Sequence, residues 1–361
     1  MSDPTQKGKT LNRIEIIDRI ENGIIVRQEL IYLLENYEEV FDYAREKAKK
    51  IAVSHFGNKV YIRGLIEISS YCKNDCYYCG LRCSNKNAQR YRLTKEDILK
   101  SCEVGYNLGF RTFVLQGGED NHFSDEVICD IVKSIKENYP DVAVTLSLGE
   151  KEKSSYERFR KAGADRYLLR HETATEAHYN KLHPYKMSFD NRMRCLDDLK
   201  SIGFQTGCGF MVGSPYQTIE NIADDLIYIH RLSPQMVGIG PFIPQHDTPF
   251  ADHKAGTWQE TCFLLSLIRI MLPRVLLPST TALGTIHPTG REKGILAGAN
   301  VVMPNLSPVN VRDKYLLYDN KICTGDEAAE CRNCLQARMN SIGYDIVISR
   351  GDSRQEGYIK K

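Results

Sequence analysis

Beyond residue 57 the sequence alternates short β-like runs with amphipathic segments, and this alternation limits the possible folds more than any other feature. The runs lie at 60–69, 112–116, 142–148, 166–170, 205–213, 236–242, 275–282 and 299–304. Between several of them, as at 94–110, 124–140 and 218–233, apolar residues recur at helical spacing. Several runs are apolar nearly throughout, as parallel strands covered on both faces are. Eight runs with crossover helices predict an α/β fold, a (β/α)8 TIM-type barrel, with a doubly wound sheet as the nearest alternative.

The length suits one barrel with a short segment on each side. A barrel of this type takes roughly 250 residues, and the chain has 361. Residues 1–56 show apolar positions three and four apart, so we expect an N-terminal helical extension. No linker or low-complexity tract interrupts 57–310, the expected barrel, and residues 311–361 are expected to form a short C-terminal appendage.

Composition argues against several classes of function. The 48 Lys and Arg residues face 46 Asp and Glu, a formal net charge of +2, so no basic surface for nucleic acid or membrane is indicated. No apolar run approaches the roughly 18 residues of a membrane span, and the N-terminus lacks a signal-peptide pattern. We therefore expect a cytoplasmic protein. In a reducing compartment, its twelve cysteines are more often metal ligands or redox groups than disulfides.

Three cysteines follow the first β run directly. Cys72, Cys76 and Cys79 have the spacing C-x3-C-x2-C, in the loop that a barrel places on its catalytic face. Thiolates suit zinc or iron–sulfur clusters, and three ligands on a four-iron cluster leave one iron open for a small molecule. A zinc site normally has four ligands. Cys83 is the candidate for a fourth, although we favour a bystander thiol at that position.

Polar residues also end the next β runs, where a barrel collects its site. The second run ends in QGGED, which comprises Gln116, Gly117, Gly118, Glu119 and Asp120. Glycines at such a position let the backbone approach a ligand closely. In the third run, Thr145 and Ser147 alternate and so share one face, as ligand donors or as small core residues.

The fourth run ends in Arg170, His171 and Glu172. A Glu at a strand end can accept hydrogen bonds from ribose hydroxyls, and an Arg can grip a carboxylate through two hydrogen bonds. For His171 we favour a structural histidine packed in the rim. Arg192 is expected on the following helix, where it either reaches a carboxylate or lies on a solvated helix face.

Later runs offer weaker candidates. Met211 ends the fifth run, and a Met in such a run is usually core. The seventh run ends in Ser279, Thr280 and Thr281. Adjacent hydroxyls on a regular strand point to opposite faces, so at most alternate ones line one cavity. We expect Thr280 and Thr281 to be substrate-cavity residues.

A second cysteine trio lies near the C-terminus. Cys323, Cys331 and Cys334 have the spacing C-x7-C-x2-C. Three thiolates suffice for an auxiliary iron–sulfur site. A zinc site completed by water or a histidine, and incidental cysteines, remain the alternatives.

The first trio, with the aromatic Tyr78 just before its last cysteine, resembles the signature of the radical S-adenosylmethionine (SAM) superfamily. Within it, the segments CKNDCYYCGLRCSNKNAQRYRLT, FVLQGGED, VTLSLGE, GADRYLLRHETA, MVGIGPFIPQHDTPF, TTALGTI and GANVVMPN closely resemble the [FeFe]-hydrogenase maturase HydE family. The resemblance runs from about residue 10 to 345 and includes the position of that family's second, variable cluster site.

The resemblance implies an enzyme with two kinds of cofactor. Cys72, Cys76 and Cys79 would hold the main [4Fe–4S] cluster, whose open iron binds SAM. Residues implied in SAM binding are Gly117, Gly118, Glu119, Thr145, Ser147, Glu172, Arg192 and Met211, and those implied in the substrate cavity are Gln116, Arg170, Thr280 and Thr281. Cys323, Cys331 and Cys334 would hold a second cluster, [2Fe–2S] or [4Fe–4S].

It also implies a role in building the H-cluster, the di-iron centre of [FeFe]-hydrogenase. SAM would be cleaved reductively to a 5′-deoxyadenosyl radical, which acts on a sulfur-bearing, cysteine-bound iron carbonyl cyanide species. HydG would make that small organometallic substrate, and the product would pass toward HydF. One departure is Gly117, because the family segment can read QSGED and the hydroxyl is missing here.

Two other functional hypotheses compete with the HydE-like one. A methylornithine synthase- or biotin synthase-like radical SAM enzyme shares the barrel motifs, but the first has little use for the C-terminal trio. The second needs auxiliary-cluster cysteines inside the barrel, where the surroundings of Cys129 and Cys208 do not match. A non-catalytic zinc or iron–sulfur binding module explains the cysteines and leaves QGGED, TLSLGE and RHET unexplained.

Overall fold

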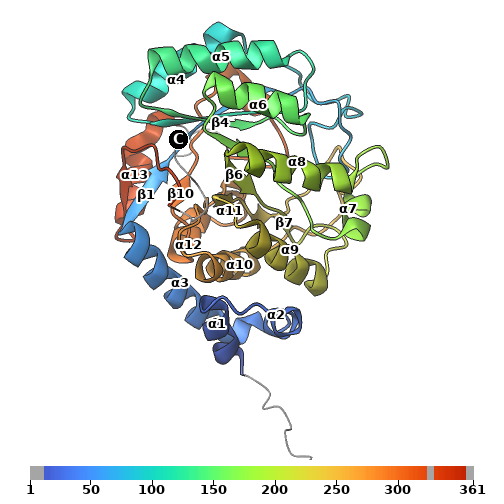
Figure 1. Cartoon of the computed structure of the whole chain (residues 1–361), viewed down its shortest axis with the longest axis vertical. Coiled ribbons are helices and arrows are strands. Elements are labelled where there is room, and N and C mark those ends of the chain that lie inside the picture. The colour runs from blue at the N-terminus through green and yellow to red at the C-terminus, as the bar shows by residue number, and fades with distance from the viewer. Residues whose placement is uncertain (1–11, 323–328, 355–361) are drawn as a thin grey trace, which may run out of the picture.

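The computed structural model describes residues 12–322 and 329–354. Its N-terminal part is helical, as predicted, with α1 (Arg13–Glu21), α2 (Arg27–Leu34), the 3-10 turn η1 (Tyr37–Val40) and α3 (Phe41–Phe56). α1 begins with a capping box and α3 ends at Gly57, whose φ of 63° favours glycine. These helices pack under the main body, α3 along α10 (Trp258–Met271) and α2 against α9 (Ile219–Leu232) (Figure 1).

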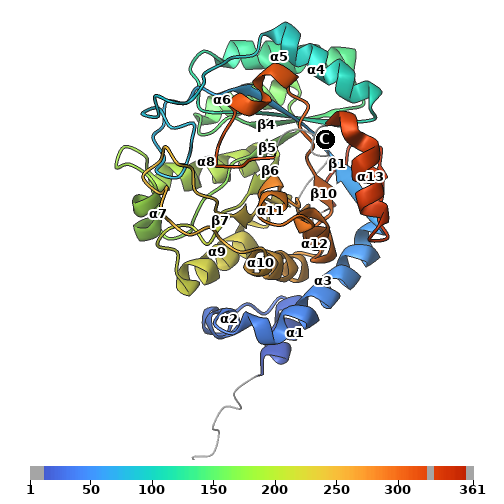
Figure 2. The same ribbon diagram turned by 180° about the vertical axis from the view of Figure 1, so that it is seen from behind.

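A six-stranded parallel sheet forms the centre, which confirms an α/β fold. Its order is β2-β3-β4-β5-β6-β8, with β2 (Gly64–Ser69), β3 (Thr112–Gly117), β4 (Ala143–Ser147), β5 (Arg166–Leu168), β6 (Gln205–Cys208) and β8 (Met236–Val237). Between successive strands the chain forms α4 (Lys95–Asn107), α5 (Asp125–Asn138), α6 (Lys153–Ala162), α7 (Glu176–Leu182), α8 (Phe189–Ile202) and α9. The two opposite views show these helices around the outside of the strands (Figures 1 and 2).

Smaller strand groups complete the molecule. β1 (Lys59–Ile62) runs parallel between β10 (Val301–Val302) and β11 (Asp345–Val347), and β7 (Met211–Val212) pairs with β9 (Gly240–Pro241). Isolated parallel bridges join Met236 to Leu276, Pro278 to Val301 and Leu65 to Asn305. The remaining helical elements are α11 (Thr281–Ile286), α12 (Gly290–Leu296), η2 (Val309–Lys314), η4 (Ala329–Cys331) and α13 (Arg332–Asn340).

Four predicted runs differ from the observed strands. Run 60–69 divides at Arg63 into β1 and β2, which pair with different partners. Runs 205–213 and 236–242 divide where Gly209, with a φ of 154°, passes so close to Gly238 that a Cβ on it would lie 2.0 Å from the Gly238 carbonyl oxygen. Run 275–282 makes only single bridges, because Pro278 has no N–H to donate and helix α11 begins at Thr281.

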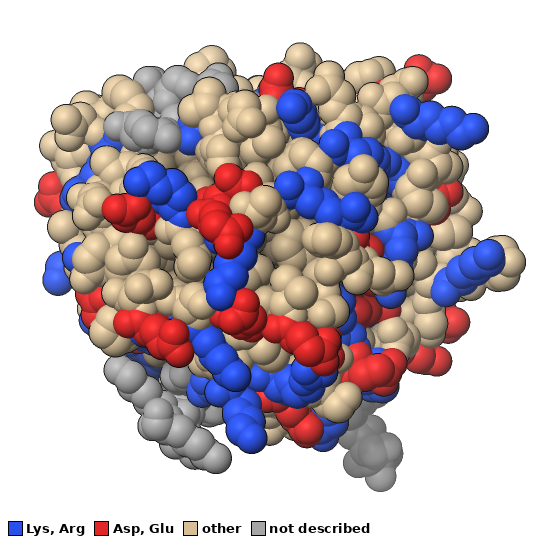
Figure 3. Space-filling view, turned by 90° about the horizontal axis from the view of Figure 1, so that it is seen from above, with Lys and Arg blue, Asp and Glu red and all other residues tan. Residues whose placement is uncertain are grey.

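The buried core is formed by apolar residues that recur at helical spacing and by the strands that they cover. α5 buries Ile128, Ile131, Val132 and Ile135, three and four residues apart, against the strands. Within the part of the chain that the structure describes, no helix has the length and apolar character needed to cross a bilayer. Figure 3 shows Lys and Arg side chains beside Asp and Glu over one face, in keeping with the balanced composition.

Candidate active site

A cavity of about 340 Å³ lies where the carboxyl ends of the strands meet the cysteine loop. Ten of the residues predicted for the site line it, namely Cys79, Gln116, Gly117, Ser147, Arg170, Glu172, Arg192, Met211, Thr280 and Thr281. Cys72, Cys76, Gly118, Glu119 and Thr145 lie outside its wall. The structure therefore brings residues from distant parts of the sequence to one cavity.

The cysteine loop is braced by backbone contacts. The N–H groups of Asn74 and Glu119 both point to Cys72 Sγ, each at 3.4 Å. The Sγ of Cys76 lies 3.7 Å from Met187 Sδ, and the Cys79 N–H donates to the Cys76 carbonyl over 3.3 Å. Donors aimed at a sulfur stabilise a thiolate more than a thiol. The loop is therefore suited to thiolate ligands.

Burial raises the pKa of all three thiols, to about 12 for Cys79 and well above the ordinary value for Cys76. The neighbouring sulfurs raise it further, because one thiolate repels the next. Partly buried soft donors of this kind fit an iron–sulfur cluster, whose positive irons would stabilise the thiolates. Among residues 12–322 and 329–354, no three His, Cys, Asp or Glu side chains lie close enough together to hold one metal ion.

The QGGED segment packs directly beneath this loop. A Cβ on Gly118 would lie 2.2 Å from the Tyr71 carbonyl oxygen and 2.7 Å from Cys72 Cβ, so only glycine fits. Glu119 is buried, its Oε1 accepting from the Glu150 N–H at 2.9 Å and its Oε2 lying 3.3 Å from Lys73 Nζ. The segment thus ties β3 to the loop that would hold the cluster.

Two ion pairs lie at one side of the cavity. Arg170 Nη2 lies 3.0 Å from Glu172 Oε2, and Arg192 Nε lies 2.7 Å from Glu150 Oε1. Arg192 is only 7 % exposed, so the alternative of a solvated helix face is wrong. Glu172 has a φ of 66°, an unusual conformation for a residue other than glycine, which aims its carboxylate into the cavity.

His171 lies outside the cavity wall and is fully buried, as expected for a structural histidine. Its Nε2 is 3.3 Å from Asp225 Oδ1, and its Nδ1 accepts from the Gly209 N–H over 3.3 Å. The Gly209 carbonyl in turn accepts from the Glu172 N–H at 3.1 Å. A chain of contacts from α9 therefore supports the strained Glu172 from behind.

The predicted hydroxyls differ in their surroundings. Among the described residues, the buried Oγ1 atoms of Thr145 and Thr280 have no hydrogen-bond partner. Thr281 Oγ1 accepts from Arg291 Nη2 at 3.2 Å. Since an orphaned buried hydroxyl costs free energy, Thr280 at the cavity wall fits a ligand that would complete its hydrogen bonding. Met211 also lines the wall, packed with Phe242.

Sequence reasoning missed one polar group in the wall. Glu67 from β2 and Lys321 from the C-terminal segment face each other, with Nζ 2.5 Å from Oε1, and Tyr315 lies beside them. The sequence could have marked Glu67 as a buried, paired carboxylate, because an acidic residue inside an otherwise apolar strand must have a buried partner. Nothing local marks Lys321, since its partner lies far away in the sequence.

The C-terminal trio is only partly described. Cys323 lies outside the described residues. Cys331 and Cys334, at the junction of η4 and α13, are joined by a disulfide. This state differs from the expected free thiolates, so the pair would bind iron only after reduction.

Comparison with known proteins gives consistent matches. The Radical SAM superfamily profile matches residues 66–229. The [FeFe] hydrogenase maturase subunit HydE of Thermotoga maritima is 45% identical over 330 residues, 91% of this chain and 94% of that protein. The crystal structure of methylornithine synthase PylB superposes with a TM-score of 0.81 at 26% identity, covering 92% of this chain and 97% of that one. The hydrogenase maturase HydG, at a TM-score of 0.80 and 22% identity over 95% and 77% of the two chains, shows the shared fold alone.

The alignment to HydE spans nearly the whole of both proteins, whereas PylB is markedly less similar in sequence. The cysteine spacing and the cavity agree with the superfamily match. This superfamily uses a [4Fe–4S] cluster and SAM; the partly buried thiols of the cysteine loop fit the cluster, and the polar groups of Glu172 and Arg192 at the cavity wall fit SAM. The chain therefore belongs to the radical SAM superfamily and, within it, to the family of the [FeFe]-hydrogenase maturase HydE.

Proposed function

We propose that the protein is a radical SAM enzyme that performs one step in the maturation of [FeFe]-hydrogenase. The observation that carries the proposal is the meeting of the cysteine loop and the polar strand ends at one cavity. When bound, the [4Fe–4S] cluster and SAM supply a 5′-deoxyadenosyl radical. The protein's own part is to bind the reactants, orient them and exclude water.

Different residues around the cavity bind the cluster, SAM and the substrate. Cys72, Cys76 and Cys79 hold the cluster, and Glu119 fixes the β3 end beneath it through its N–H contact to Cys72. Glu172 and Arg192 are the polar groups for the ribose and the carboxylate of SAM, both from the side nearest β5 and α8. Gly117, Gly118, Thr145, Ser147 and Met211 complete the SAM-binding set. Gln116, Arg170, Thr280 and Thr281 remain for the substrate.

The substrate we propose is a sulfur-bearing, cysteine-bound iron carbonyl cyanide species. The name of the Thermotoga maritima relative supports a place in hydrogenase maturation. A cavity of about 340 Å³ suits a small organometallic compound better than a macromolecule. HydG would supply this compound and HydF would receive the product.

We also propose that the strands close into a complete (β/α)8 barrel, residues 57–310, between a helical extension, 1–56, and a C-terminal appendage, 311–361. The bridges of Leu276 to β8, Pro278 to β10 and Leu65 to Asn305 support closure, because they continue hydrogen bonding from one edge of the six-stranded sheet to the other.

A second iron–sulfur cluster on Cys323, Cys331 and Cys334 is part of the proposal. Replacing Cys331 or Cys334 by Ala should lower the iron bound after anaerobic reconstitution while SAM cleavage continues. Unchanged iron content in those variants would show that the trio holds no cluster.

The function is tested by its first chemical product. We would reconstitute the protein anaerobically with iron and sulfide, reduce it with dithionite, add SAM, and quantify 5′-deoxyadenosine and methionine. The HydG product is then added, and its infrared bands should change only when SAM is present. A protein that cleaves SAM but forms 3-methylornithine, the product in the name of the methylornithine synthase relatives, would favour that alternative.

A further inference from the structure

Tyr78 lies between two proposed cluster ligands, Cys76 and Cys79, and its side chain lines the cavity. The proposed function gives this residue no part. Its ring packs against an apolar cluster that contains Met211 and Phe242, which line the same cavity. This part of the wall is therefore apolar and aromatic, and a flat aromatic group suits it.

His183 contacts the hydroxyl of Tyr78 from outside the cavity wall. Its Nε2 lies 3.1 Å from that hydroxyl, and the two rings meet edge to face with centroids 5.4 Å apart. On its other side, the imidazole stacks on Tyr179 with a centroid distance of 4.0 Å. Because His183 is only 1 % exposed, water does not compete for the hydroxyl.

The local sequence explains why His183 stands at this point. His183 follows the last residue of helix α7 and precedes Pro184, which restricts it to extended backbone, and its φ of −130° and ψ of 150° are extended. The last carbonyls of a helix lack partners within it. The Tyr179 carbonyl accepts from His183 Nδ1 at 3.0 Å, and the Leu182 carbonyl accepts from the Tyr77 N–H at 3.0 Å. One helix end thus holds both the imidazole and the cysteine loop.

These contacts fix the direction of the hydrogen bond to Tyr78. A carbonyl can only accept, so the proton of the His183 ring is on Nδ1. Burial lowers the pKa of His183 to about 3, and the ring is therefore neutral at pH 7. Its Nε2 is then an acceptor, and the Tyr78 hydroxyl donates to it. The hydroxyl is used outside the cavity, and Tyr78 presents its ring to a ligand.

We propose that His183 is a positioning residue, which holds the ring of Tyr78 in the orientation that receives the adenosyl part of SAM. A purine is a flat aromatic group that packs on an aromatic ring. A ring that is already fixed loses little freedom when the ligand binds, and this improves the affinity. The assignment rests on the proposed function, because that function supplies SAM.

The two parts of SAM, 5′-deoxyadenosine and methionine, are the probes, and the binding of each is measured by calorimetry on the reconstituted protein. His183→Leu removes the acceptor, Tyr78→Phe removes the donor, and the double variant removes both. His183→Gln keeps an acceptor on its side-chain oxygen. His178→Leu is the matched control, because His178 is a buried histidine of the same helix that lies outside the cavity wall and contacts the Pro215 carbonyl at 3.0 Å.

His183→Leu should weaken the binding of 5′-deoxyadenosine about threefold to tenfold, because the Tyr78 ring regains its freedom, and should leave methionine within about twofold. Tyr78→Phe should weaken it equally and the double variant no further, since both changes remove the same hydrogen bond. His183→Gln should retain the wild-type affinity, and His178→Leu should leave both ligands unchanged.

Three results would overturn the positioning role. They are wild-type affinity for 5′-deoxyadenosine in folded His183→Leu, an equal loss of methionine in that variant, and additive losses in the double variant. Failure of His183→Gln to bind better than His183→Leu would count against it in the same way.

The two proposals fail in different ways. If the wild-type protein cleaves SAM and His183→Leu binds 5′-deoxyadenosine normally, the positioning role is wrong and the function stands. If the wild-type protein binds neither SAM nor 5′-deoxyadenosine, the proposed function is wrong, and the positioning role falls with it.

Discussion

Gly117 and Gly118 are adjacent, yet their surroundings differ sharply. A Cβ on Gly118 would collide with the Tyr71 carbonyl oxygen at 2.2 Å, whereas the nearest atom to a Cβ on Gly117 is Ile68 Cγ1 at 3.4 Å. The first contact is impossible without moving the cysteine loop, and the second is ordinary packing. Position 117 therefore has room for the serine found in the related segment QSGED, and the missing hydroxyl leaves the backbone there undisturbed.

This contrast predicts opposite outcomes for two small substitutions. Gly118→Ala should displace Cys72 and lower the iron retained after anaerobic reconstitution several-fold, because the clash is with backbone. Gly117→Ser, the matched control, should retain wild-type iron content and a wild-type melting temperature. Equal iron in the two variants would mean that Gly118 does not support the loop.

The cysteines themselves allow a second matched comparison. Cys76 is a proposed cluster ligand, while Cys83 is exposed and lies beyond the motif. Cys76→Ala should abolish formation of 5′-deoxyadenosine, a loss of at least about a thousandfold, whereas Cys83→Ala should leave the rate within about twofold. SAM cleavage by Cys76→Ala at the wild-type rate would exclude that thiol as a ligand.

At the scale of secondary-structure elements, helix α9 supports the end of β5. Asp225 is fully buried and contacts both His171 Nε2 and the Ala174 N–H, on either side of Glu172. A left-handed non-glycine residue costs roughly 1–3 kcal/mol and persists only where neighbours hold it. The Asp225–His171 contact therefore holds Glu172 in its position at the cavity.

Asp225→Asn should weaken SAM binding, because an amide in place of the carboxylate no longer fixes the His171 tautomer or its orientation. We expect about a tenfold increase in the Kd for SAM, roughly 1.4 kcal/mol, measured by calorimetry on the reconstituted protein. Asp224→Asn, at the next position of α9 and paired with Arg27 at the surface, should leave the Kd unchanged. A purely structural role for Asp225 would lower the melting temperature and spare the SAM affinity.

Some secondary-structure elements could be predicted from the sequence and others could not. The β3 and β4 strands and the helices α4, α5 and α9 were predictable from local patterns. The run of β3 is apolar nearly throughout, that of β4 alternates, and the three helices carry apolar residues three and four positions apart. The run at 275–282 was not, because Val275, Leu276 and Leu277 are buried like strand residues while Pro278 and the start of α11 prevent a ladder. The Glu67–Lys321 pair depends on a contact across the whole chain, which no local pattern encodes.

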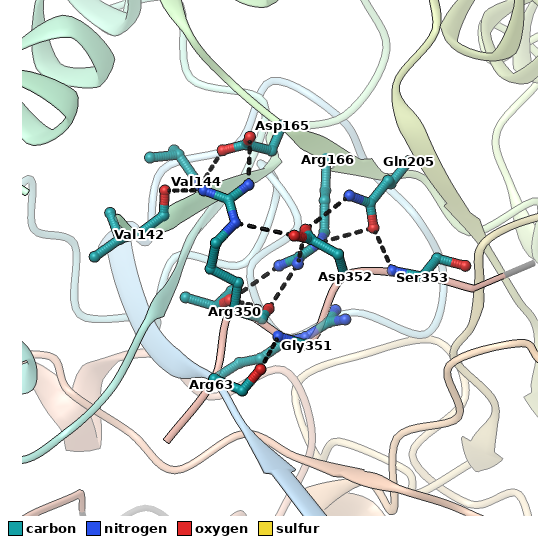
Figure 4. A network of polar contacts seen from close by, with 12 residues as sticks. Arg63, Val142, Val144, Asp165, Arg166, Gln205, Arg350, Gly351, Asp352 and Ser353 are labelled. Atoms are coloured by element: carbon teal, nitrogen blue, oxygen red, sulfur yellow. Dashed lines mark hydrogen bonds and ion pairs between the residues drawn. The ribbon is translucent and has the colours of Figure 1, made fainter. Parts of the chain in front are cut away.

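At the scale of the whole molecule, the C-terminal segment ties distant parts of the fold together. The Leu317 carbonyl accepts from the Gly80 N–H at 2.9 Å, beside the cysteine loop, and β11 adds to β1 at another edge. Beyond β11, Arg350 contacts Asp165 at 2.8 Å, and Asp352 contacts Arg166 at 2.8 Å (Figure 4). One segment therefore links the site to the amino ends of β5 and β6.

Asp352 makes this attachment dependent on pH. Burial raises its pKa, but the Arg166 charge and hydrogen bonds from Arg350 and Gln205 outweigh burial and bring the pKa well below the ordinary value. The folded protein therefore holds the proton more weakly than the unfolded chain. The stabilisation is fully present above the unfolded pKa of about 3.9 and is lost as pH falls through the folded value.

Asp352→Asn should lower the free energy of unfolding by about 3 kcal/mol at pH 7, since it leaves the buried Arg166 guanidinium without its counter-charge. Below about pH 4 the difference from wild type should shrink, because the unfolded wild-type chain then binds a proton at Asp352 that the folded protein still excludes. Urea unfolding at a series of pH values measures both effects. Asp141→Asn, at a half-exposed carboxylate paired with Arg111, should cost under about 1 kcal/mol at every pH. A loss for Asp352→Asn that stays constant from pH 7 to pH 3 would mean that the side-chain shape, rather than its charge, secures the segment.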